Sequence, residues 1–232
     1  ILVGQTWQVK YTGGDVRYYP QFHIQHSGSP LSAWLGKTDR GIGKEGCELG
    51  ALGGAPRWIA SKQEINKTVE QIIAENGRID ICVNNAGILR TGDVLEISEE
   101  DFDIVLSVNL KGAFLMSQAV GRHMAKAGSG SIINMSSVNG VMTIPTILPY
   151  NVAKGGLDQL TRVMAMGLAD KGIRVNGIGP GSILTEMLQQ VMSDDEKRNA
   201  ILSRTPMGRC GEVDEIAKIA LFLASEDSSY IT

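Results

Sequence analysis

Tyr150 and Lys154 stand four residues apart in the stretch YNVAK. On a helix this spacing puts the two side chains on one face, within reach of each other. A neighbouring ammonium favours the phenolate form of a tyrosine, whose pKa is ordinarily about 10. Lowering that pKa by about three units takes roughly 4 kcal/mol, which a lysine and a second positive charge could share. The pair therefore predicts a general acid or base at Tyr150.

A serine could assist this tyrosine. Ser137 closes the stretch SIINMSS, thirteen residues before Tyr150. Its hydroxyl could donate a hydrogen bond to the same substrate oxygen that Tyr150 protonates. Tyrosine and lysine also meet at this spacing by chance, and a serine at the end of a strand often only caps a turn. The surrounding elements must therefore decide whether these residues form a site.

Helical and strand patterns alternate along the chain from about Ser61 onward. Gly77 is expected to end the first helix, and Ser98 with Asp101 forms a capping box that starts the second. Helices are predicted over residues 65–73, 98–127, 150–169 and 213–224, and strands in IDICVNNAG, SIINMSS and IRVNGIGPG. This alternation predicts an α/β fold, with one doubly wound parallel sheet and helices on both faces.

Small and polar residues follow each of the three strands. They are Asn84, Asn85, Ala86 and Gly87, then Ser136 and Ser137, then Pro180 and Gly181. The carboxyl ends of parallel strands meet at one edge of the sheet, where such folds bind ligands. Each group alone also suits an ordinary turn between a strand and a helix. Together they predict a ligand site at this edge.

Composition excludes several classes of protein. The 232 residues are 43% hydrophobic with a net charge of −3, which suits one substantial soluble domain. No long run of like charge predicts a nucleic-acid partner, and no segment approaches the length of a membrane span, so a small neutral or anionic ligand is expected. Cys47, Cys82 and Cys210 include no C-x-x-C pair, which predicts reduced thiols rather than disulfides or a metal site. With no secretory signal at Ile1, these thiols predict a cytoplasmic location.

Six features in a fixed order and spacing resemble a classical short-chain dehydrogenase/reductase. They are residues 84–87 (NNAG), Asn109 in VNLKG, Ser137, Tyr150, Lys154, and Pro180 with Gly181. The similarity covers about residues 62–232, because residues 204–232 also resemble the family's C-terminal region. The resemblance implies one Rossmann-type domain, with residues 1–60 as its cofactor half and residues 61–232 as its catalytic half. It also implies an NAD(P)-dependent oxidoreductase that transfers a hydride between a nicotinamide and a secondary alcohol or ketone.

The same resemblance implies a role for each residue of the site. Tyr150 exchanges the proton with the substrate oxygen, and Ser137 polarises that oxygen. Lys154 lowers the pKa of the tyrosine and binds the hydroxyls of the nicotinamide ribose, while Asn109 holds a water that links the lysine to solvent. Further cofactor contacts are implied for Asn84, Ala86 and Gly87 near the adenosine, and for Pro180, Gly181, Ile183 and Thr185 against the nicotinamide and pyrophosphate. The choice between NAD and NADP stays open.

Residues 1–60 lack the T-G-x-x-x-G-x-G turn with which this family normally begins. Gly41, Ile42 and Gly43 in DRGIGKEG resemble the second half of that turn and are predicted to contact the pyrophosphate. A P-loop is the weaker interpretation of this stretch, because Leu31 stands where its first glycine is required. No periodicity is sustained through these residues, so an irregular segment is expected.

Three interpretations of this segment stay open. In the first, some residue identities in this segment are wrong. In the second, the cofactor half genuinely diverges from the family. In the third, the chain is rearranged, with residues 4–6 (GQT) resembling the family's last strand. The broken glycine turn also leaves a rival function, a non-catalytic scaffold of the same fold. The complete set of Ser137, Tyr150 and Lys154 favours the enzyme.

Substrate choice is expected to depend on residues 186–209, which are predicted to form a mobile lid. An apolar face of the lid could contact substrate or simply pack on the body of the protein. This face consists of Met187, Leu188, Val191 and Met192. Val138, Ile144 and Pro145 beside the site favour an apolar or mixed substrate. The family resemblance further implies a homotetramer built on the helices over residues 98–127 and 150–169.

Overall fold

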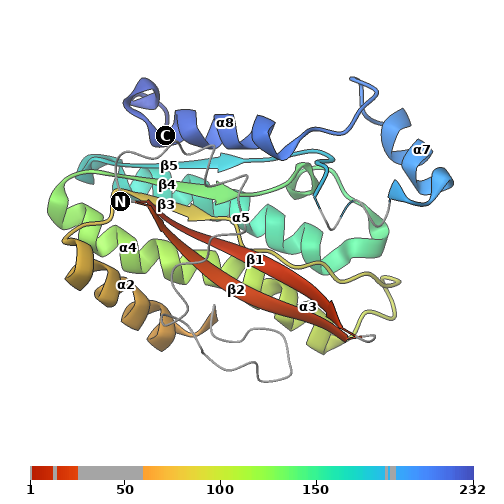
Figure 1. Cartoon of the computed structure of the whole chain (residues 1–232), viewed down its shortest axis with the longest axis horizontal. Coiled ribbons are helices and arrows are strands. Elements are labelled where there is room, and N and C mark those ends of the chain that lie inside the picture. The colour runs from red at the N-terminus through yellow and green to blue at the C-terminus, as the bar shows by residue number, and fades with distance from the viewer. Residues whose placement is uncertain (1, 13–14, 26–59, 186–187, 189–191) are drawn as a thin grey trace.

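The computed structural model describes residues 2–12, 15–25, 60–185, 188 and 192–232. Within these ranges the strands form one sheet in the order β2-β1-β3-β4-β5 (Figure 1). The strands are β1 (Leu2–Thr12), β2 (Asp15–Gln25), β3 (Ile81–Asn84), β4 (Gly130–Met135) and β5 (Ile173–Ile178). Neighbouring strands are parallel from β1 through β3 and β4 to β5, while β2 runs antiparallel to β1. The predicted parallel sheet is confirmed, with an antiparallel strand at one edge.

Helices lie on both faces of the sheet, as the sequence predicts. They are α2 (Lys62–Asn76), α3 (Glu99–Leu106), α4 (Ala113–Ala127), α5 (Leu148–Leu168), α7 (Asp195–Ser203) and α8 (Val213–Ala224). Helices α2, α4 and α5 lie on one side and α8 lies on the other (Figure 1). Helix α2 begins where Ser61 accepts a hydrogen bond from the N–H of Glu64, and it ends at Gly77, whose φ is 80°. Glycine adopts this left-handed conformation without strain, which explains the stop.

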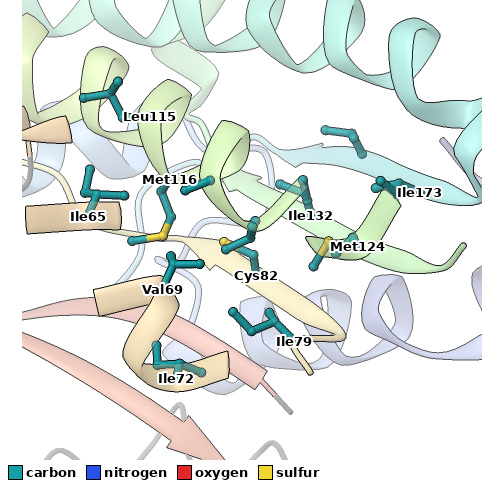
Figure 2. Close-up of a cluster of buried hydrophobic side chains, with 13 residues drawn as sticks. Ile65, Val69, Ile72, Ile79, Cys82, Leu115, Met116, Met124, Ile132 and Ile173 are labelled. Carbon is teal, nitrogen blue, oxygen red and sulfur yellow. The ribbon is translucent and has the colours of Figure 1, made fainter. Parts of the chain in front are cut away.

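The two faces of the sheet bury separate hydrophobic clusters, because successive residues of a strand point to opposite sides. Cys82 of β3 and Ile132 of β4 point toward α2 and α4, where Met116 packs with them (Figure 2). Val83 and Ile133 point the other way and pack against α8. All five side chains are at most 1% exposed. Burial on both faces accounts for the apolar runs in these strands.

The predicted helix over residues 98–127 is interrupted. A π-helical segment, η2 (Ser107–Gly112), joins α3 to α4 and carries Asn109. Short π segments inside α-helices are frequent at functional sites, because they change the direction in which side chains leave the helix.

By length and composition, the run Glu99–Ala127 could cross a membrane, alone among the helices that the structure describes. The expectation that no segment approaches the length of a membrane span is therefore wrong. The window is 61% buried inside the protein, as is usual for a helix at the centre of a globular domain.

Residues 2–12 and 15–25 form a β-hairpin, so the expectation of an irregular segment is wrong there. Thr12 pairs with Asp15, and the strands stay in register to their far ends. The signal was present in the sequence: Trp7, Val9 and Tyr11 alternate with polar residues, and a Gly-Gly pair separates the strands.

The hairpin joins the parallel sheet through β1. Leu2 pairs with Ile81 and Gly4 pairs with Val83 of β3. In a doubly wound fold the first strand lies beside the fourth, in the interior of the sheet, and the last strand lies at an edge. Because β1 lies between β2 and β3, this arrangement does not favour the rearranged chain.

Candidate active site

Two of the predicted strand-end segments are bound to each other. Ser136 and Ser137 directly follow β4. The N–H of Ser136 donates to the carbonyl of Ile178 at the end of β5 (2.7 Å), and the N–H of Val138 donates to the carbonyl of Pro180 (3.0 Å). These backbone bonds hold the turn that carries Ser137 against the exit of β5.

Tyr150 lies in the first turn of α5, and Ser137 is near enough to influence the pKa of its phenol. Burial raises the pKa of Tyr150, and Ser137 opposes that shift. The sequence predicts a lowered pKa, which is wrong for the chain by itself because removal from water disfavours the phenolate. Tyr150 is therefore a neutral phenol near pH 7, the form that can give a proton to a ketone oxygen.

Lys154 lies one turn further along α5 and is only 3% exposed. Its Nζ donates to the carbonyl of Met135 at 2.6 Å and lies 5.4 Å from the centroid of the Tyr150 ring, within range of a cation–π contact. Burial lowers the pKa of Lys154 to about 8, and the charge of Asp158 opposes that shift. An ammonium has three N–H donors, so two remain for oxygens of a bound molecule.

Asn109 is fixed by the loop that follows β3. Its Oδ1 accepts from the N–H of Ile88 at 2.8 Å, and its Nδ2 donates to the carbonyl of Ile88 at 2.9 Å. A Cβ at Gly87 would lie 3.6 Å from Asn109 Oδ1 and 3.7 Å from Lys154 Nζ, so Gly87 lies between the two side chains. The amide of Asn109 is thus engaged with backbone, and a water held by this residue stays a prediction.

Asn84 points into the protein rather than toward the ligand edge. Its Nδ2 donates to Ser117 Oγ and to Asn134 Oδ1, both at 2.8 Å, and the residue is 4% exposed. Asn134 in turn donates to Thr161 of α5 at 2.9 Å. This network joins β3, β4, α4 and α5, and it leaves only the backbone of Asn84 for the predicted adenosine contact. Polar residues in otherwise apolar strands were the signal that could have found the network.

The segment after β5 is held by the loop before α8. Ile183 forms an isolated bridge with Gly211, and the N–H of Leu184 donates to the carbonyl of Gly211 at 2.8 Å. A Cβ at Gly211 would lie 2.6 Å from Ile183 Cδ1, so a larger residue there would require the end of the Ile183 side chain to shift. At Gly181, in contrast, a Cβ would meet nothing within 4 Å, and Thr185 is exposed. The predicted nicotinamide-side residues therefore border open space.

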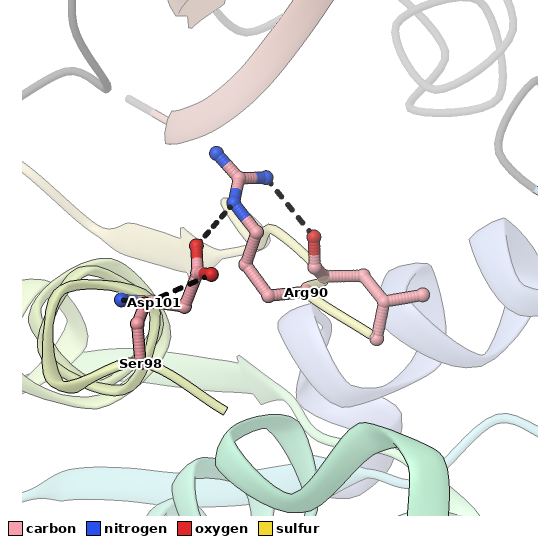
Figure 3. A network of polar contacts seen from close by, with 4 residues as sticks. Arg90, Ser98 and Asp101 are labelled. Atoms are coloured by element: carbon pink, nitrogen blue, oxygen red, sulfur yellow. Dashed lines mark hydrogen bonds and ion pairs between the residues drawn. The ribbon is translucent and has the colours of Figure 1, made fainter. Parts of the chain in front are cut away.

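Arg90, which the sequence analysis missed, ties the loop after β3 to the start of α3 (Figure 3). Its Nε donates to Asp101 Oδ1 at 3.0 Å, and its Nη1 donates to the carbonyl of Leu89 at 3.1 Å. The N–H of Asp101 donates to Ser98 Oγ at 3.1 Å, which confirms the predicted helix start. An ion pair as exposed as Arg90–Asp101 contributes about 1 kcal/mol or less to the free energy of unfolding, so its main effect is to orient the loop.

The donor set fits the nicotinamide half of a dinucleotide. Ser137 and Tyr150 present hydroxyls, Lys154 retains two N–H donors, and Gly181 leaves space beside them. Several predicted contacts lie outside the described residues: Gly41, Ile42 and Gly43 of the pyrophosphate turn, and Met187 and Val191 of the lid. The pyrophosphate contact therefore stays a prediction.

Comparison with known proteins agrees with this chemistry. A family model described as enoyl-(acyl carrier protein) reductase matches residues 56–232. The 3-oxoacyl-(acyl-carrier-protein) reductase FabG of Thermotoga maritima is 42% identical over 174 residues, which cover 75% of this chain and 70% of the relative. Gluconate 5-dehydrogenase of Gluconobacter oxydans is 40% identical over 173 residues, which cover 75% and 68%.

Solved structures resemble this chain to a similar extent. A gluconate 5-dehydrogenase from Burkholderia cenocepacia, in complex with NADP and tartrate, has a TM-score of 0.73 and 38% identity, over 75% of this chain and 68% of that one. An NAD⁺-bound xylitol dehydrogenase has a TM-score of 0.71 and 32% identity, over 75% and 73%. The family match contains all the predicted catalytic residues, whereas residues 1–55 lie outside it.

Proposed function

This chain belongs to the short-chain dehydrogenase/reductase family, and we propose that Ser137, Tyr150 and Lys154 perform its chemistry. It is an NAD(P)-dependent oxidoreductase of ketones and alcohols. The observation that carries the residue assignment is the buried ammonium of Lys154, which lies 5.4 Å from the centroid of the Tyr150 ring, with Ser137 near the phenol. The rival scaffold is disfavoured, because the relatives are named oxidoreductases and the catalytic set is complete.

In ketone reduction, Tyr150 donates its proton to the substrate oxygen while Ser137 donates a hydrogen bond to it. Both hydroxyls can act on one oxygen, because Ser137 lies near enough to Tyr150 to influence the pKa of its phenol. When bound, the nicotinamide supplies or accepts the hydride. The Lys154 ammonium stabilises the phenolate left on Tyr150. In alcohol oxidation the same phenolate takes the proton.

The remaining proposed contacts orient the cofactor. The two spare N–H donors of Lys154 suit the hydroxyls of the nicotinamide ribose. Ala86 and Gly87 would pass along the adenosine side, and Pro180, Gly181, Ile183 and Thr185 along the nicotinamide and pyrophosphate. Asn109 lies close enough to Lys154 for a shared water to connect the lysine with solvent. Either NAD or NADP is compatible with these contacts.

We propose an apolar or mixed substrate. Val138, Val141 and Met142 closely follow Ser137 and are 39%, 80% and 69% exposed. The N–H groups of Val141 and Met142 both donate to the carbonyl of Val138, so these residues form one compact turn. Apolar side chains beside a few polar groups are the usual surroundings of a small organic ligand. A ketone carrying an apolar chain therefore suits this site better than a highly charged one.

A homotetramer and a cytoplasmic location are also proposed. The hollow between α3, η2, α4 and α5 is open and mainly apolar, as expected of a surface that packs on another copy. Its apolar lining consists of Leu106, Leu110, Phe114, Leu160 and Val163. Light scattering would give the number of copies, and Val163→Glu should reduce that number.

The cysteines support the cytoplasmic location. Cys82 and Cys210 are free and buried, which suits a reducing compartment.

The first experiment is a fluorescence titration with NADH and, separately, NADPH. Micromolar binding of either identifies the cofactor and permits turnover assays with ethyl acetoacetate and with 5-ketogluconate. Faster turnover of the ester would support the apolar substrate, and faster turnover of the sugar acid would contradict it. Failure of a folded protein to bind either cofactor would instead favour the scaffold.

A further inference from the structure

We infer that Asp158 is a positioning residue of this active site. Its carboxylate supplies the negative charge that balances the buried Lys154 ammonium, and it packs against the turn that carries Ser137. The inference rests on the proposed roles of Tyr150 and Lys154 and extends them to a residue that contacts neither substrate nor cofactor.

The charge of Lys154 needs a partner because the side chain is almost wholly buried. Burying an uncompensated ammonium is costly, and the carbonyl of Met135 is a neutral acceptor. Asp158 follows Lys154 by four residues on α5, so both side chains lie on the same face of the helix. No ion pair joins these two described residues, so the carboxylate acts on the ammonium through space. Its negative charge favours the charged form of Lys154.

Asp158 also contacts the turn that begins at Ser137. A Cβ at Gly140 would collide with Oδ2 of Asp158 and would lie 3.2 Å from the carbonyl of Lys154. The N–H of Gly140 donates to the carbonyl of Ser137 at 2.9 Å, which closes this turn. The carboxylate therefore abuts the backbone whose other end carries the Ser137 hydroxyl, and its packing helps to set where Ser137 lies.

Among the residues that the structure describes, the titratable groups that act on Lys154 or contact it are Tyr150 and Asp158, both on α5. The neighbours from β4 and η2 are uncharged, namely the carbonyl of Met135 and the amide of Asn109. Other charged side chains on α5 and on the elements packed against it have other neighbours: Arg162 donates to Gln159, and Asp103 and Lys111 line the apolar hollow. A change in the protonation of Lys154 can therefore be traced to Asp158.

Asp158→Asn tests the charge while keeping the shape of the side chain. The pKa of Lys154, about 8 in this chain, should fall further in the variant because the favourable charge is gone. The variant should unfold at a lower temperature than the parent near pH 6.5, where the ammonium must be kept charged. This difference should shrink toward about pH 9.5, where Lys154 is mostly neutral in both proteins. Cofactor-free protein is used for this comparison.

Asp170→Asn is the matched control, because Asp170 lies just after α5 and pairs with Lys171 at the surface. It should show no pH-dependent difference from the parent. A difference between Asp158→Asn and the parent that is the same at every pH would overturn the charge role, since lost packing alone does not depend on pH.

Kinetics give the second measurement. In Asp158→Asn, the alkaline fall of kcat/KM for the cofactor should move down by about half a pH unit or more. An unshifted profile in an active variant would contradict the inference while leaving the proposed function intact. If the parent itself showed no turnover with NADH or NADPH, the proposed function would fail, and the unfolding comparison would still decide the role of Asp158.

Discussion

Ser137 and Tyr150, thirteen residues apart in the sequence, come together where the exit of β4 meets the first turn of α5. Ser137 lowers the pKa of Tyr150, whereas burial raises it, and burial is the larger effect. Lys154 lies beside the ring of Tyr150 rather than in a hydrogen bond to its hydroxyl. The protonation of Tyr150 in the chain by itself therefore depends on its burial and on Ser137.

Tyr150→Phe should lower turnover by a factor of about 10² to 10⁴, because it removes the proton donor and leaves the ring in place. Cofactor affinity, measured by fluorescence titration, should change little. Tyr230→Phe is the control, since Tyr230 is fully exposed near the end of the chain. Retained turnover in Tyr150→Phe would contradict the assigned role.

Ser137→Ala should lower kcat by about 10²-fold, because one donor to the substrate oxygen is lost. It should also raise the pKa of Tyr150, because the Ser137 side chain that lowers it is gone. Alcohol oxidation requires the phenolate, so the acid limb of its kcat/KM profile should move to higher pH. Ketone reduction requires the phenol, so its alkaline limb should move the same way. The measurement is the pH profile of kcat/KM for oxidation and for reduction. If Ser137 did not lower the pKa of Tyr150, both limbs would stay at the same pH in Ser137→Ala.

Asn134→Ala should lower the free energy of unfolding by about 1–3 kcal/mol, because it leaves a buried N–H of Asn84 without an acceptor. Urea unfolding followed by circular dichroism measures this loss. Gln71→Ala, on the exposed side of α2, should change stability by less than about 0.5 kcal/mol. An equal effect of the two substitutions would mean that the buried network contributes nothing.

Gly140→Ala should destabilise the protein by about 1–3 kcal/mol and lower kcat, because its Cβ would push against Asp158 and the carbonyl of Lys154. The resulting shift of the turn displaces Ser137. Gly167→Ala, on α5, is the matched control: a Cβ there meets nothing within 4 Å, and alanine favours the helix by about 1 kcal/mol. Thermal unfolding and steady-state rates compare the two, and indistinguishable variants would rule out close packing at Gly140.

Much of the fold from residue 61 onward is predictable because its signals are local. Ser61, Gly77 and Ser98 mark helix ends through hydrogen bonds and dihedral angles that involve only neighbouring residues. The interruption at η2 was not predicted, since a π segment has nearly the same spacing of apolar residues as an α-helix. The hairpin of β1 and β2 was predictable from its alternation and was overlooked.

The sequence by itself determined that Tyr150 and Lys154 share one face of a helix, and that Ser137 and Gly181 follow strands which end at the same edge of a sheet. These relationships follow from the geometry of a single helix or strand. Only the tertiary structure decided that Asn84 points inward and that burial raises the pKa of Tyr150. Solvent exclusion and hydrogen bonds between distant segments depend on how the elements pack, which the local pattern of residues does not specify.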